Sequence, residues 1–174
     1  MNSIALKERG WLIMVVVALV ALLARVIPSP RTIDDAFITF RYARNLVEGQ
    51  GFVYNPGVQT LGTTTPLYTL LMAGISTVTG GQDFPWYALT VNALADAGAA
   101  ILLFLILRRV TGHDWISGLL GLLWAVSPRS VAFAVGGMET SVVILWMLAA
   151  VWSYLQVGDG GRTAVRPYVY VGLF

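Results

Sequence analysis

The chain has 174 residues, of which 57% are hydrophobic and 11% are charged, and its mean hydropathy is +0.73. Soluble domains are about 45–50% apolar and about 25% charged, so this composition excludes an ordinary soluble domain and a disordered chain. The absence of cysteine excludes a disulfide scaffold. The net charge of +2 comes from cations scattered among long apolar runs, so we expect a lipid bilayer as partner and no nucleic acid.

The apolar runs predict an all-α protein with several membrane-spanning helices, because a span needs about 20 largely apolar residues. The expected spans are residues 10–27, 86–107, 115–135 and 140–157. The first is typical of a signal anchor, with a cleaved signal peptide as the alternative, and Arg25 near its end is expected to reach the membrane interface. A further apolar helix begins at 168–174 and is cut short there, so we expect the amino-terminal part of a longer protein.

Residues 28–85 are expected to form an extracytoplasmic loop with juxtamembrane amphipathic helices at 33–48 and 66–79. The expectation rests on the positive-inside bias, which places the basic residues next to the spans on the cytoplasmic side: Lys7, Arg9, Arg108, Arg109, Arg162 and Arg166. This orientation requires that 66–79 does not cross the membrane. The alternative is that 66–79 is itself a span, which would place Arg108 and Arg109 outside.

The helix expected at 33–48 carries an acidic pair, Asp34 and Asp35, in its first turn, and Thr32 is its expected N-cap. At helical spacing its side chains form two faces. The apolar face has Ala36, Phe40, Ala43 and Val47, and the polar face has Asp34, Arg41, Asn45 and Glu48. One interpretation is a carboxylate-rich face toward an aqueous cleft. The other is structural, because acidic residues in a first turn complement the helix dipole.

Other polar residues in the apolar regions have a structural and a functional interpretation. Asn92 and Asp96 share one face of a span, for which a contact between helices is favoured over a functional role. Glu139, with Arg129 as a candidate partner, is expected to reach the same cleft as Asp34 unless it serves only as a helix N-terminal charge. His113 is expected in a solvated loop, and no metal-ligand cluster is evident.

Several motifs follow one another along the chain in a defined order. An acidic pair after the first span, at Asp34 and Asp35, is followed by a Gly-x-Gly-Phe-Val-x-Asn-Pro-Gly turn at 49–57. A Thr-Thr-Pro-Leu-Tyr helix start at 64–68 comes next. Ser127-Pro128 and the Gly-Met-Glu-Thr stretch at 137–140 complete the pattern, which covers residues 5 to 157. The pattern resembles membrane glycosyltransferases of the GT-C class, in the arabinofuranosyltransferase-like and protein-mannosyltransferase-like branch.

The resemblance implies transfer of a sugar from a polyprenyl-phosphate donor to an acceptor hydroxyl on the outer face of the membrane. It implies Asp34 as general base and Asp35 as a partner that orients the acceptor, positions a divalent metal ion or raises its neighbour's pKa, with roles that can be exchanged. Candidate substrate contacts are Arg41, Arg44, Thr64, Thr65 and Glu139. The arginines would bind the phosphate, the alternative being that they neutralise nearby acids or lipid headgroups.

The sequence also departs from the pattern. Thr64 and Thr65 stand where mannosyltransferase-like members carry a lysine, and Leu61 stands where arabinofuranosyltransferase-like members carry a glutamate, so the sugar is not defined. The alternative function is a non-catalytic polytopic membrane protein, either a transporter segment or a lipid-binding scaffold. In both cases the expected location is the cell membrane, and the sequence gives no oligomeric state.

Overall fold

The computed structural model describes residues 3–58, 60 and 62–159, and the regular elements in these residues are helices. In chain order they are α1 Ser3–Val26, α2 Asp34–Val47, α3 Pro66–Thr79, α4 Phe84–Thr111, α5 Asp114–Ala125, α6 Pro128–Val135 and α7 Thr140–Asp159. The all-α fold class is thereby confirmed. The helix expected at 168–174 lies outside the described residues. The basic residues Arg162 and Arg166, expected on the cytoplasmic side, also lie outside them.

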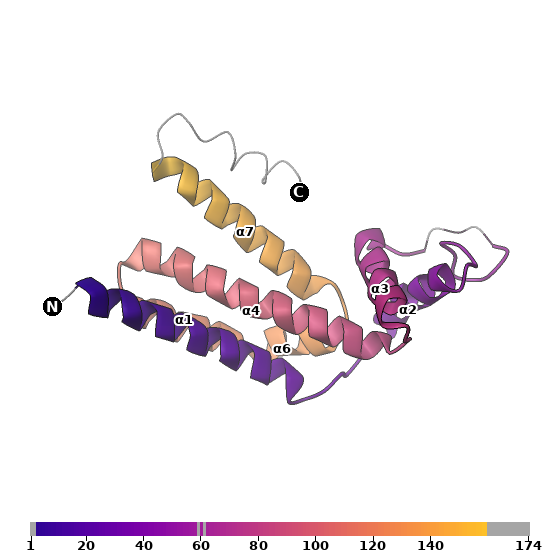
Figure 1. The fold of residues 1–174 in the computed structure, drawn as a ribbon, viewed down its shortest axis with the longest axis horizontal. Coiled ribbons are helices and arrows are strands. Elements are labelled where there is room, and N and C mark those ends of the chain that lie inside the picture. Colours follow the sequence, from indigo (N-terminus) through magenta and orange to yellow (C-terminus); the bar gives the residue numbers. More distant parts are fainter. Residues whose placement is uncertain (1–2, 59, 61, 160–174) are drawn as a thin grey trace.

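The long helices α1, α4 and α7 run along the long axis of the molecule, and α2 and α3 lie beyond one end of them (Figure 1). Helix α4 is central, because it contacts α1, α5, α6 and α7. Its 28 residues would extend about 42 Å at 1.5 Å per residue, which exceeds the thickness of the hydrocarbon layer. Helices α1 and α4 are each long and apolar enough to cross a membrane.

The expected span at 115–135 consists of two helices, α5 and α6, which are bent by 50° at their junction. The pair is long and apolar enough for one span when its two helices are counted together, so this crossing stays a prediction. The cause is Pro128 at the start of α6, since proline has no amide hydrogen and disfavours the helical conformation in the preceding residue. Ser127 accordingly has an extended ψ of 124°. The apolar stretch 140–156 of α7 falls in the shorter class, so its crossing stays a prediction.

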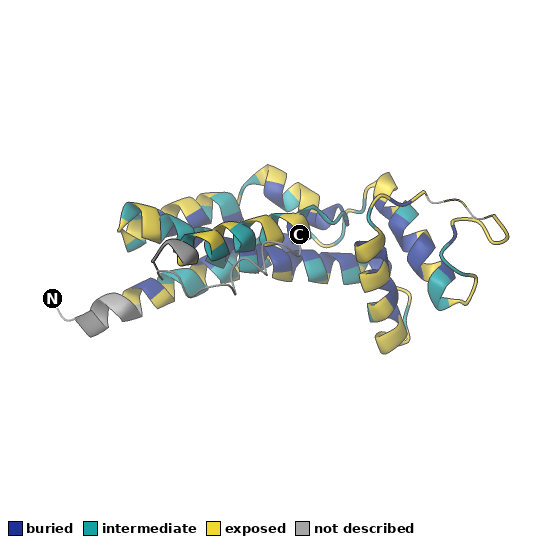
Figure 2. Cartoon of the chain, turned by 90° about the horizontal axis from the view of Figure 1, so that it is seen from above, coloured by how far each residue is buried: buried dark blue, intermediate teal, exposed yellow. Residues whose placement is uncertain are grey.

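The seam between α1 and α5 contains small residues. Gly118 and Gly121 of α5 face Ile13 and Val17 of α1, and a Cβ at Gly121 would lie 3.1 Å from Val17 Cγ1. Such residues allow helix backbones to approach closely in a membrane. Exposed positions line the outer sides of the long helices (Figure 2), and on α1 they include large apolar side chains, Leu12, Val16, Leu19 and Leu23. An apolar outer surface of this kind is suited to lipid.

Arg25 does not extend out of the bundle toward lipid headgroups as expected, because its side chain is fully buried. Its Nε lies 2.7 Å from Asp96 Oδ2 of α4, and its Nη2 donates to Ser130 Oγ of α6 at 2.7 Å. Its Nη1 donates to the carbonyl oxygens of Ala21 and Ala125. The sequence predicted a helix whose arginine faces lipid. In the structure, α4, α5 and α6 enclose the Arg25 side chain instead.

Helix α3 packs on α2 at the end of the bundle, and its 14 residues are too few to cross the hydrocarbon layer. Glu48 after α2 accepts a hydrogen bond from Gln82 Nε2 at 3.1 Å, so the segments before and after α3 lie side by side. Arg9 and Arg108 line one cavity at the opposite end of the bundle. This arrangement agrees with a helix 66–79 that does not cross, but its topology and the end that faces the cytoplasm both stay predictions.

Candidate functional site

The acidic pair lies at the N-terminus of α2, where the turn between α6 and α7 holds the backbone in place. The amide of Arg31 donates to the carbonyl of Val135 at 2.9 Å, and the amide of Ile33 donates to the carbonyl of Gly136 at 3.0 Å. These bonds hold the residues before α2 in an extended conformation, so the N-cap is Ile33 rather than the expected Thr32. The Ile33 side chain makes no cap bond. Asp34 and Asp35 are both exposed at the beginning of the helix.

The turn between α6 and α7 fits closely against α2. Gly137 has a φ of +84°, and a Cβ added there would lie 3.3 Å from Ala36 Cβ and 3.2 Å from Phe40 Cζ. A larger residue would be strained by the backbone conformation and crowded by α2. This fit brings residues near 137 to the first turns of α2, although they lie about a hundred positions further along the sequence.

Asn92 of α4 connects this turn to α3. Its Nδ2 donates to the carbonyl oxygens of Ala134 at 3.0 Å and Met138 at 2.8 Å, and its Oδ1 accepts a bond of 3.4 Å from the hydroxyl of Tyr68. Burial raises the pKa of Tyr68, and the negative charge of Glu139 raises it further, against the lowering effect of the hydrogen bond to Asn92. The phenol therefore stays neutral near pH 7 and remains a donor.

Glu139 is half-buried near Tyr68. The expected pairing with Arg129 is not observed, and Glu139 makes no salt bridge with another described residue. Its neighbours place it on the same side of the bundle end as the start of α2, since Met138 packs against the cluster that contains Ala36 and Phe40. The sequence motifs around residues 34, 68 and 139 thus meet at one end of the molecule.

Asp34 and the two arginines of α2 lie on one helix face, because residues 34, 37, 41 and 44 are spaced by three and four positions. A cavity of about 380 Å³ opens on this face, lined by Phe37, Phe40, Arg41, Arg44, Asn45 and Tyr54. Arg41 Nε donates to the Tyr54 carbonyl at 2.8 Å, and its Nη2 donates to Asn55 Oδ1 at 3.2 Å. The guanidinium of Arg44 lies 5.8 Å from the ring centre of Phe84.

The alternative that Arg41 and Arg44 neutralise acidic neighbours is not supported within the described chain, where neither forms a salt bridge with Asp34, Asp35 or Glu48. Asn45, expected on the polar face, is instead buried, because its Nδ2 donates to the carbonyl oxygens of Val53 and Tyr54. Both Asn45 and Arg41 therefore hold the turn after α2, and Arg44 is left with an aromatic contact and an exposed head group.

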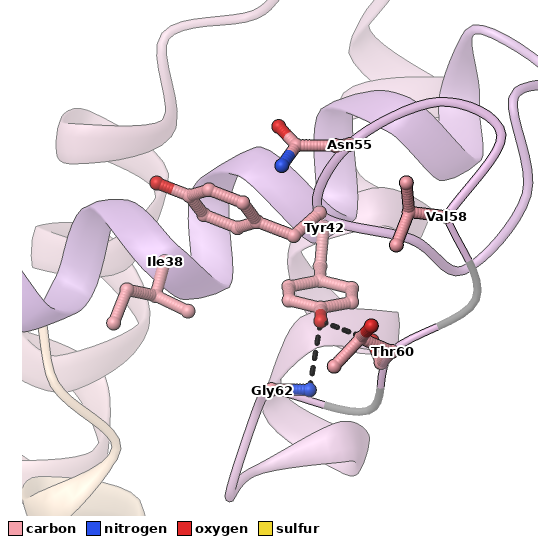
Figure 3. A pocket seen from close by; sticks show the side chains of 7 residues that line it. Ile38, Tyr42, Asn55, Val58, Thr60 and Gly62 are labelled. Atoms are coloured by element: carbon pink, nitrogen blue, oxygen red, sulfur yellow. Dashed lines mark hydrogen bonds between the residues drawn. The ribbon is translucent and has the colours of Figure 1, made fainter.

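A second cavity, of about 350 Å³, lies between α2 and the loop that precedes α3 (Figure 3). Tyr42 points from α2 into this region, where its hydroxyl donates to the Thr60 carbonyl at 2.6 Å and accepts from the Gly62 amide at 2.7 Å. Ile38, Asn55 and Val58 line the same cavity. The described part of the loop before α3 is thus bonded to α2 at two places. Arg41 and Asn45 bind residues 53–55, and Tyr42 binds Thr60 and Gly62.

Thr64 is exposed and Thr65 is partly exposed at the start of α3. Thr65 is the N-cap of that helix but makes no side-chain cap bond, and its amide donates to Thr63 Oγ1 at 3.3 Å. Thr63 is the buried member of the run and lies 3.3 Å from Thr69 Oγ1. The hydroxyls of Thr64 and Thr65 form no hydrogen bond with another described side chain, so they are accessible to a ligand.

Sequence reasoning missed the parts played by Tyr42, Thr63 and Tyr68. Tyr68 stands inside the quoted motif at 64–68, but its contact with Asn92 joins residues 24 positions apart on different helices, and periodicity carries no such information. The sequence favoured a contact between helices over a functional role for Asn92 and Asp96. Their hydrogen bonds to Ala134 of α6 and Arg25 of α1 agree with this interpretation. In the described residues, no group of three or more His, Cys, Asp or Glu side chains is placed to hold a metal ion.

The chain is 27% identical over 135 residues to a terminal beta-(1->2)-arabinofuranosyltransferase of Mycobacterium tuberculosis. The similarity is to a glycosyltransferase. It covers 69% of this chain and 21% of the relative, so the chain spans about a fifth of the relative's length. No protein-family profile and no solved structure matches the chain. The comparison supports a distant, glycosyltransferase-type relationship, and the apolar helices agree with a membrane protein.

Proposed function

We propose that this chain belongs to a membrane glycosyltransferase that moves a sugar from a polyprenyl-phosphate donor to an acceptor hydroxyl on the outer face of the membrane. The observation that carries the proposal is the meeting of three separate motifs at one end of the bundle, with two exposed and unpaired carboxylates at its edge. The similarity to an arabinofuranosyltransferase gives the same type of reaction. Donor, acceptor and outer location are parts of the proposal.

The reaction requires a base, because an acceptor hydroxyl is a weak nucleophile. In the proposed step the acceptor oxygen forms a bond to the anomeric carbon of the sugar, and the bond from that carbon to the phosphate oxygen breaks. The polyprenyl phosphate leaves with the electron pair, and the carboxylate of Asp34 takes the hydroxyl proton. Asp34 has no hydrogen bond or salt bridge within the described chain, so its oxygens are available to accept that proton.

The donor phosphate fits the cavity lined by Arg41 and Arg44. Arg44 is the stronger candidate, because the donors of Arg41 already bind the Tyr54 carbonyl and Asn55. Seven to ten positions separate these arginines from Asp34, which is about 10–15 Å along a helix, and long helical side chains lean toward the N-terminus and shorten that gap. Thr64, Thr65 and Glu139 are proposed contacts for the sugar or the acceptor, and Asp35 orients the acceptor or a metal ion.

The test is Asp34→Asn in the full-length protein, measured as sugar transfer from a polyprenyl-phosphate donor. The amide keeps the size of the side chain but cannot take the proton, so turnover should fall about 10²–10⁴-fold while donor binding changes little. If Asp34 serves only the helix dipole, the change costs about 0.3–1 kcal/mol of stability and leaves the rate almost intact.

Asp83→Asn is the matched control, because Asp83 is an exposed aspartate at another helix start and makes no side-chain cap bond. It should keep parental turnover. An Asp34→Asn protein that expresses normally and turns over within threefold of the parent would remove Asp34 as the base.

A further inference from the structure

A third cavity lies at the end of the bundle opposite to the acidic pair, and the proposed glycosyl transfer does not use it. Its volume is about 620 Å³. Three elements contribute to its lining: α1 with Arg9 and Ile13, the end of α4 with Arg108, and the start of α5 with His113, Asp114 and Trp115. Charged and apolar side chains therefore share one cavity at the end of the long helices.

The cavity carries more positive than negative charge. Arg108 Nε binds Asp114 Oδ1 at 2.6 Å, so this carboxylate is already neutralised. Helix α1 passes close to the pair, since a Cβ at Gly10 would lie 2.9 Å from Asp114 Oδ2 and 3.0 Å from Arg108 Nη1. Arg9 is exposed and adds a second positive charge, which has no counterion among the side chains that the structure describes. The expected ligand group is an anion.

An apolar stripe on α5 begins at the same cavity. Trp115, Leu119 and Leu123 follow one another at intervals of four, which places them on one helix face, and they are 65%, 51% and 58% exposed. Ile13 of α1 also lines the cavity and packs against Gly118 of α5. The site thus joins a basic cavity to an apolar surface that runs along a membrane helix.

We propose that this cavity binds an anionic phospholipid, with the phosphate of the headgroup at Arg9 and Arg108 and an acyl chain along the stripe of Trp115, Leu119 and Leu123. Guanidinium groups form charge-assisted hydrogen bonds with phosphate oxygens, and basic pockets between membrane helices suit acidic headgroups. A free phosphate ion would use the arginines but not the stripe. A tryptophan at the border between cavity and stripe matches the depth at which headgroup meets acyl chain.

The test is lipid binding by the delipidated full chain, followed by native mass spectrometry with phosphatidylglycerol, phosphatidylcholine and inorganic phosphate as separate probes. Phosphatidylglycerol should bind in preference to the other two. Arg9→Gln should weaken phosphatidylglycerol binding about fivefold, and the double change with Arg108→Gln should weaken it further, because each cation near an anionic lipid contributes on a similar scale. Trp115→Ala should weaken the binding of the lipid.

Arg31→Gln is the matched control, because it removes an exposed arginine at the other end of the bundle. It should leave lipid binding unchanged. Arg9→Gln is the variant least expected to disturb folding, since Arg9 is exposed and forms no salt bridge with a side chain that the structure describes. Equal affinity for phosphatidylcholine, parental affinity in the double variant, or inorganic phosphate binding as tightly as phosphatidylglycerol would each overturn the proposal.

Discussion

The guanidinium of Arg25 connects four helices through hydrogen bonds to Asp96, Ser130 and two backbone carbonyls. One of these carbonyls, from Ala125, lies at the end of α5, where the helix stops and its own acceptors lack helical partners. Ser130 belongs to α6, and the turn that follows α6 packs against the first turns of α2, where the acidic pair lies. A buried ion pair within the bundle is therefore linked to the geometry of the proposed site.

Removing one member of this pair should strongly destabilise the protein, because the other charge stays buried without a partner. Asp96→Leu or Arg25→Met alone should lower the free energy of unfolding by about 3–5 kcal/mol. The double variant should lose less than the sum of the two single changes, since it leaves no unpaired charge. Unfolding in bicelles checks this, with Arg31→Gln as the control. Additive losses would contradict a direct coupling of the two side chains.

Sequence reasoning identified that Asp96 needs a partner, because an intramembrane carboxylate is costly, but it did not identify Arg25. The two residues are 71 positions apart, and only the packing of α1 against α4 brings them together. The acidic pair illustrates the same limit. Its place at a helix start was predictable from composition and spacing, whereas its closeness to the turn at 136–137 depends on tertiary contacts.

At the scale of elements, the seam between α1 and α5 depends on glycine. A Cβ at Gly118 would collide with Ile13 Cγ2, a methyl group on a β-branched side chain with little rotamer freedom in a helix. Gly118→Ala should therefore destabilise the protein by about 1–3 kcal/mol through overpacking.

Gly74 of α3 provides the opposite test, since a Cβ there would meet no atom within 4 Å. Gly74→Ala should stabilise α3 by about 0.5–1 kcal/mol, because glycine is unfavourable in a helix interior. Both variants are measured by chemical unfolding in the same detergent. A Gly118→Ala protein as stable as the parent would show that the seam can open without cost.

Helical spacing predicted α2 and α3 closely, because each has an apolar face of the right period and clear end signals. The hydropathy of the run at 115–135 continues past residue 127 and predicts one span, but it does not predict the 50° bend that divides the run into α5 and α6 at Pro128. A hydropathy average does not register a single proline. Backbone chemistry at one position thus decided the form of a whole element.

At the scale of the whole molecule, two ends of the bundle carry different chemistry. The acidic pair, Tyr68 and Glu139 lie at the end with α2 and α3, and the cavity with Arg9 and Arg108 lies at the other. A lipid-linked sugar donor has its reactive phosphate at the membrane surface, so a site at a bundle end suits it. The proposed function therefore depends on which end faces outward.

The positive-inside bias predicts that the end with α2 and α3 is outside. The chain has no cysteine, so single cysteines can be labelled without background. Gln50→Cys, Asp83→Cys and His113→Cys all replace exposed residues. In intact cells an impermeant maleimide should label the first two, which lie before and after α3, and should label His113→Cys only after permeabilisation. Labelling of only one of the first two would show that α3 crosses the membrane, and labelling of His113→Cys in intact cells would reverse the orientation and place the acidic pair inside.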